Sequence, residues 1–167
     1  MAQQPGDLNY DNEFWRFSLA VYGQGEVAKE CLVLQDALGL DVNILLFCAW
    51  LGTHSVVLQR EDIEAALRAV AAWHDDVVRP LRVVRQRTKA LSGDDDFRAS
   101  IKDAEIKAEQ IEQAMLFALA QQLQRRGSIE DDTIAINVHR YIEMKSPTSD
   151  EASAAHLVQA ARRFADG

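Results

Sequence analysis

The sequence predicts an all-α protein: a single-domain helical bundle with a long antiparallel hairpin and a buried central helix. Apart from Asp41 at its start, the segment 40–52 is apolar on every helical face except at Asn43, so other helices must surround it. Apolar residues recur at alternating steps of four and three along 61–91 and along 97–126, as on amphipathic helices. The one ambiguous β-branched segment, 133–142, has no second strand signal to pair with. We therefore expect five to seven helices.

The length and composition favour one hydrophobic core. A chain of 167 residues, 48% hydrophobic and 26% charged, buries about 70% of the surface of its unfolded form. We expect a flexible leader at 1–10, a helical core at 11–127 and a C-terminal helical extension at 128–167. The central segment is shorter than the roughly 20 residues that cross a bilayer, and no secretory signal is recognised. A cytoplasmic protein is predicted, with Cys31 and Cys48 reduced and buried.

Helix-terminal residues place the elements of the N-terminal half. An aromatic-rich first helix follows a capping Asp11 or Asn12 and stops at Gly23. The apolar pattern then resumes until Gly39, which supplies a C-terminal stop. Asp41 is placed to cap the central helix.

Two long helices form the predicted hairpin, 61–91 against 97–126, joined by the acidic turn 92–96. The apolar stripe of the first runs through Val77, Leu81 and Val84. Pro80 lies inside this stripe, and proline clashes with the carbonyl four residues back. We expect a kink near Asp76, or two helices that meet there.

The C-terminal part fits two further helices. The segment 133–142 alternates like a strand and also fits a helix; helix is preferred for lack of a partner strand. Thr148 and Glu151 resemble a capping box for a last amphipathic helix. Its apolar positions are Leu157, Val158, Ala161 and Phe164.

The charge pattern restricts the partners. A net charge of −8 disfavours nonspecific binding to nucleic acid or to an anionic membrane. Five cations crowd one segment, and Arg82, Arg85 and Lys89 share one side of it. They either dock an acidic partner or form a solvated face away from the apolar stripe, and the sequence favours the solvated face.

Asn43 is the sharpest polar anomaly, because a buried amide must find hydrogen-bond partners. It either bridges neighbouring helices or lines a small polar pocket with Asp41 and Arg16. The candidate ligand-binding residues are Arg16, Asp41, Asn43, His74 and Arg79. If a ligand binds there, these five should converge on one cavity.

The run from His74 through Asp75 and Asp76 resembles the first aspartate-rich motif of trans-polyprenyl diphosphate synthases, whose paired aspartates bind Mg²⁺. Arg79 stands where that motif needs a third aspartate, and no second motif is present. A diphosphate-type ligand is therefore a minor alternative. No cysteine or second histidine lies at ligand spacing from His74. The sequence predicts no catalytic residue, no metal site and no cofactor.

Four separated blocks resemble a mainly proteobacterial family of small helical proteins of unknown function. The blocks are 14–19, 31–36, 41–50 and 78–82. The resemblance covers about residues 11 to 126 and implies a helical fold in a bacterial cytoplasm, with no activity to transfer. We expect a nonenzymatic protein-interaction or regulatory protein with an unidentified protein partner, and homo-oligomers are compatible with this. The alternative is a small-molecule binding protein or enzyme with a polar pocket between helices.

Overall fold

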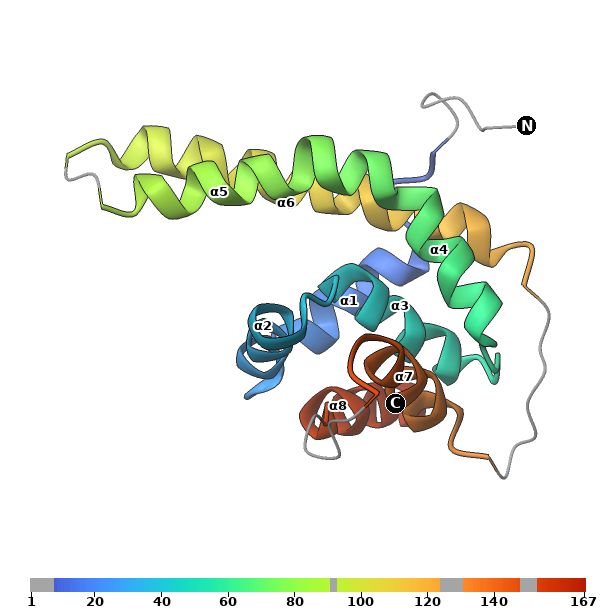
Figure 1. Cartoon of the computed structure of the whole chain (residues 1–167). Helices are drawn as coiled ribbons and strands as arrows, with labels where there is room; N and C mark the ends of the chain where they lie inside the picture. The colour runs from blue at the N-terminus through green and yellow to red at the C-terminus, as the bar shows by residue number, and fades with distance from the viewer. Residues whose placement is uncertain (1–7, 91–92, 124–130, 148–152) are drawn as a thin grey trace.

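The computed structural model describes residues 8–90, 93–123, 131–147 and 153–167 and confirms the all-α prediction, with no strand in these ranges (Figure 1). The elements are α1 (Glu13–Tyr22), α2 (Val27–Leu38), α3 (Val42–Thr53), α4 (Arg60–Trp73), the π-helical turn η2 (His74–Val78), α5 (Arg79–Thr88), α6 (Asp95–Ala120), α7 (Thr133–Lys145) and α8 (Ala155–Asp166). Because α4, η2 and α5 form one continuous rod, the described ranges hold seven helical rods. Within these ranges no helix combines the length and the apolar character needed to span a bilayer.

The helix α3 is the centre of the molecule, as the apolar segment predicted. Every residue from Asn43 to Gly52 is buried, and α1, α2, α4, α6, α7 and α8 all contact this helix. The Asp41 side chain caps α3 by accepting a hydrogen bond from the Asn43 backbone. The stop before it also forms as predicted, with Gly39 in the left-handed region at φ 65°.

The two C-terminal helices belong to the same core. α7 lies along α3, where Gly52 allows the two backbones to approach closely. Val138 and Tyr141 of α7 and Leu157 of α8 are fully buried. Residues 128–167, expected to form an extension, therefore supply part of the hydrophobic core through their described portions. The predicted capping box, which spans Thr148 and Glu151, falls outside the described residues.

The long rod bends at η2, and Figure 1 shows α4 and α5 running in different directions. The bend lies where it was predicted. Pro80 has no N–H, and its ring would crowd the Asp76 carbonyl in a regular α-helix, so the wider π turn accommodates it.

The π turn also shifts the buried face, which corrects one expectation. The predicted stripe continued through Val77, Leu81 and Val84, but Val78 is the fully buried residue and Val84 is 39% exposed. A π turn holds an extra residue, so each later side chain is rotated relative to α4. The face that follows Val78 instead carries Arg82 and Arg85.

The helices α5 and α6 lie side by side and run antiparallel (Figure 1). Arg82 contacts Glu105 at 3.4 Å and Glu109 at 3.1 Å, and Arg85 also pairs with Glu105. The expected solvated face is therefore wrong for these two arginines. α6 begins at Asp95, capped by Asp94, and ends at Ala120 rather than near 126. The expected stop at Gly127 lies outside the described residues.

Candidate functional site

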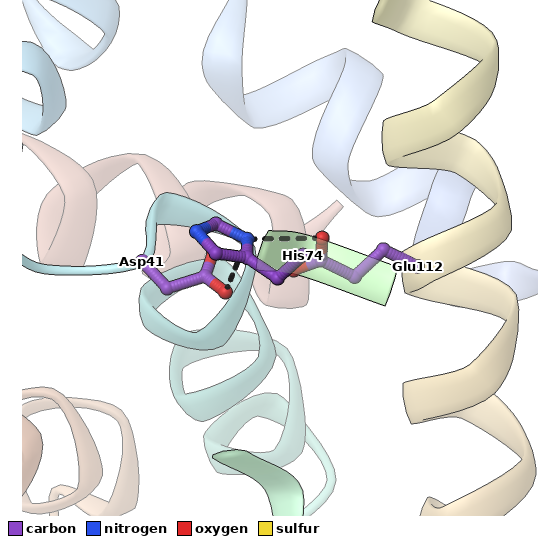
Figure 2. A group of neighbouring side chains, drawn as sticks. All are labelled: Asp41, His74 and Glu112. Carbon is purple, nitrogen blue, oxygen red and sulfur yellow. Dashed lines mark hydrogen bonds and ion pairs between the residues drawn. The ribbon is translucent and has the colours of Figure 1, made fainter. Parts of the chain in front are cut away.

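Three ionisable side chains from separate parts of the chain meet beside the start of α3 (Figure 2). Asp41 precedes α3, His74 opens η2 and Glu112 lies in α6. His74 Nδ1 is 3.2 Å from Asp41 Oδ2 and 3.1 Å from Glu112 Oε2. The exposed fractions of the side chains are 18% for His74, 10% for Asp41 and 0% for Glu112. We call this cluster the Asp41–His74–Glu112 triad.

Hydrogen bonds from four helical elements hold the triad in place. Asp41 Oδ1 accepts from the Asn43 backbone at 2.9 Å, which leaves Oδ2 toward His74. The Asp41 backbone N–H donates to the Tyr141 hydroxyl at 2.9 Å. On the other side, Trp73 Nε1 donates to the Ala108 carbonyl at 2.9 Å. This last bond fixes the start of η2 to α6, one turn before Glu112.

Burial and close charges perturb the triad. Burial raises the pKa of Asp41 to about 8, and the nearby Glu112 carboxyl adds to this rise. The pKa of His74 is also raised, chiefly by its hydrogen bond to Glu112. Glu112 Oε1 is buried and has no hydrogen-bond partner among the residues that the structure describes. Such a cluster can hold protons or a cation, and its three ligand atoms lie within 4.8 Å of one another.

A pocket of about 790 Å³ is lined in part by Val42 and Gln113. These two residues directly follow Asp41 and Glu112 of the triad in the chain. Its walls come from α1, α2 and α3 on one side and from α5 and α6 on the other. The larger apolar and aromatic lining residues are Trp15, Leu19, Tyr22, Leu32, Val42, Leu46 and Ile106. The charged lining residues are Arg82, Arg85, Lys89, Arg98, Lys102, Asp95, Glu105 and Glu109.

Two buried polar atoms of the pocket residues lack partners. Ser18 is 3% exposed and Gln113 is 2% exposed. Their Oγ and Oε1 atoms have no hydrogen-bond partner in the described ranges of the chain. Gln113 Nε2 donates to Asn43 Oδ1 at 2.9 Å. The Asn43 amide therefore bridges α3 and α6, as the first of the two interpretations of this residue predicted. Unsatisfied buried acceptors are rare because they are costly.

The five predicted ligand residues do not all converge. Asp41 and His74 meet in the triad, and Asn43 lines the neighbouring pocket. Arg16 is exposed on α1 and does not line the pocket. Arg79 is exposed and pairs with Asp75 at 3.2 Å. The reason is geometric: α1 buries the face that bears Phe14 and Phe17, and Arg79 follows the π turn on its outer side.

Sequence reasoning missed Glu112, Gln113 and Ser18. A signal existed for the first, because Glu105 and Glu112 are seven residues apart and flank the buried Ala108 at steps of three and four. Such acids lie on the apolar face of α6. Nothing in the sequence identifies the residues that they contact.

A comparison with protein families agrees with the predicted resemblance. The model of a family described as "Protein of unknown function (DUF2390)" matches residues 13–116, which include the whole triad. No curated protein and no solved structure matches the chain. The chain belongs to the DUF2390 family of unknown function.

Proposed function

We propose that this protein is a nonenzymatic binding protein for a small amphipathic organic anion, held in the pocket between α1, α2, α3 and the α5–α6 pair. The main support is the coincidence, in one pocket, of an apolar wall, excess positive charge and two lining residues whose buried oxygens have no partner in the described ranges. The volume of about 790 Å³ is within the range of roughly 300–1,000 Å³ typical of small-molecule sites.

The apolar wall supports a ligand with a hydrocarbon body. Leu19, Leu32 and Ile106 line the pocket yet are exposed. Large apolar side chains grouped at one concave surface are stabilised when a ligand removes them from water. A ligand with several carbon atoms fits this requirement.

The charges support an anionic head group. Five cationic and three acidic residues line the pocket, a positive excess in a chain of net charge −8. Arg82, Arg85 and Arg98 are paired with these acids. Lys89 and Lys102 form no ion pair with any described residue. A carboxylate, sulfonate or phosphate would pair with these two lysines.

The unpartnered atoms support a hydrogen-bond donor on the ligand. Gln113 Oε1 can only accept, whereas the Ser18 hydroxyl can donate or accept. Both oxygens are covered from solvent, so a hydroxyl or amide N–H of the ligand would reach Gln113 Oε1 only after a rotation of the glutamine side chain. A bond formed there is withdrawn from water, where it contributes most.

The test uses 8-anilinonaphthalene-1-sulfonate, an amphipathic anion whose fluorescence reports binding. We expect saturable binding to the folded wild type and several-fold weaker binding to Lys89→Gln and Ala99→Phe, which change two lining residues. The matched control is Arg87→Gln, an exposed cation of α5 that does not line the pocket. Dodecanoate should displace the probe better than dodecanol. Equal affinity in all four proteins would contradict the proposal.

A second candidate function is the protein interaction expected from the sequence. It is supported by Val83, Val84 and Phe97, large apolar residues that are exposed and lie outside the pocket lining. Replacing Val84 with Asp should abolish a complex captured from a native lysate and leave probe binding intact; capture that is unaffected would contradict it. A bacterial cytoplasmic setting, compatible with the free thiols of Cys31 and Cys48, is part of the same proposal.

A further inference from the structure

We infer that the Asp41–His74–Glu112 triad is a binding site for a divalent first-row transition-metal ion such as Zn²⁺, Mn²⁺ or Co²⁺. This inference is independent of the ligand proposed for the pocket. It departs from the sequence-based expectation of no metal site, which considered only residues close together along the chain.

The spacing of the ligand atoms fits one ion. Metal–ligand bonds of about 2.0–2.1 Å place adjacent ligand atoms about 2.9 to 3.4 Å apart in tetrahedral or octahedral geometry. His74 Nδ1 is 3.2 Å from the Asp41 oxygen and 3.1 Å from the Glu112 oxygen. Figure 2 shows both carboxylates directed at this one ring nitrogen. Because all three ligand atoms lie within 4.8 Å of one another, one ion between them can bind all three groups.

Hydrogen bonding alone leaves this cluster incompletely satisfied. Nδ1 carries at most one proton, yet it faces two carboxyl oxygens. Glu112 is fully buried, and its second oxygen, Oε1, has no partner within the described part of the chain. Bidentate coordination by Glu112 would satisfy Oε1.

The surrounding groups already orient the ligands. Asp41 Oδ1 is held by the Asn43 backbone, and the Trp73 indole anchors the residue before His74 to α6. A hydrogen bond to a ligating carboxylate, such as the one from Asn43, is typical of metal sites. The partial exposure of His74 and Asp41 gives water access to the remaining coordination positions.

The chemistry of the ligands selects the class of ion. An imidazole suits Zn²⁺, Mn²⁺, Fe²⁺ and Co²⁺ better than Ca²⁺ or Mg²⁺, which prefer all-oxygen sites. With no thiolate or thioether in the triad, a site for Cu⁺ is disfavoured. Two carboxylates can neutralise a divalent charge in this buried position.

The experiment titrates Zn²⁺ and, separately, Co²⁺ into the chelator-treated full chain. We expect one ion per chain by calorimetry, and a melting temperature that rises with the metal and falls again with EDTA. Glu112→Gln and His74→Gln should each weaken binding by more than about tenfold. His156→Gln, an exposed histidine of α8, and Glu143→Gln, an exposed glutamate of α7 that does not line the pocket, should bind as the wild type does.

A wild-type measurement guards against variants that fail to fold. In long-range proton–nitrogen spectra, Zn²⁺ should shift the ring nitrogens of His74 and leave the other three of the four histidines unchanged. The inference is overturned if the wild type shows no saturable binding, if another histidine shifts instead, or if folded Glu112→Gln keeps the wild-type affinity.

Discussion

The contact between α3 and α7 depends on the missing side chain of Gly52, and Gly52→Ala tests it. A Cβ at this position would lie 2.5 Å from Ile134 Cα and 2.7 Å from Ile134 N. Both atoms belong to the backbone of α7, so no rotamer change relieves the overlap. Ordinary contacts begin at 3.4 Å, and α7 would have to move by about 1 Å.

Two opposing terms set the size of the effect. Alanine favours a helix over glycine by about 0.5–1 kcal/mol, with the smaller value expected here because Gly52 lies near the end of α3. Overpacking costs about 1–3 kcal/mol, with the larger value expected because backbone atoms clash. Moving α7 also strains the bond from Thr133 Oγ1 to the Gly52 carbonyl, which is 2.6 Å long. We expect a net loss of about 2 kcal/mol in the free energy of unfolding.

Urea denaturation followed by circular dichroism measures this loss. The matched control is Gly23→Ala at the end of α1, where φ is −78° and a Cβ would lie 3.4 Å from its nearest atom, the Leu19 carbonyl oxygen. This control should change stability by less than about 0.5 kcal/mol. If Gly52→Ala were as stable as the wild type, the close approach of α3 and α7 would be refuted.

Three further predictions concern buried polar groups and thiols. Asn137→Leu removes hydrogen bonds to the Leu58 N–H and to the Val56 and Cys48 carbonyls, and should cost about 3 kcal/mol in urea denaturation; a loss below about 1 kcal/mol would contradict the network. Burial raises the pKa of the Cys31 thiol from 9.0 to about 12. Because the thiolate is the reactive form, alkylation of Cys31 in the native state at pH 8 should be about a thousandfold slower than alkylation of an ordinary thiol. Mass spectrometry measures this rate. The pKa of Asp41 rises from 3.8 to about 8 on folding, so between these two pH values the metal-free native state binds one proton more than the unfolded state. The free energy of unfolding should therefore fall as pH rises from about 4 to about 8. Asp41→Asn should flatten this dependence of stability on pH.

Local signals made most of the helices predictable. A helix such as α3, apolar on all faces, can only be central, and the cap at Asp41 and the stop at Gly39 depend on residues within one turn. The bend at η2 followed from the stereochemistry of Pro80 alone. The end of α6 was placed too late because the amphipathic pattern continues beyond Ala120, and periodicity does not show where packing ends.

The candidate site was predictable only in part, because its geometry depends on long-range packing. Asp41 was predicted to cap the central helix, and both Asp41 and His74 were among the candidate ligand-binding residues. Their contact joins residues 33 positions apart, and Glu112 lies another 38 positions along the chain. Arg16 and Arg79 were chosen by charge, which does not report the direction of a side chain.

The π turn connects the fold to both proposed sites. Had the rod stayed regularly α-helical, the stripe through Val77 and Val84 would face α6, and the α5–α6 pair would have an apolar interior. The extra residue in η2 instead directs Arg82 and Arg85 toward Glu105 and into the pocket wall. Ion pairs withdrawn from water often stabilise a protein less than apolar packing of the same volume. The lower stability expected of these ion pairs is consistent with selection for a charged pocket wall. The same π turn, η2, begins with His74, which belongs to the metal-binding triad that we infer.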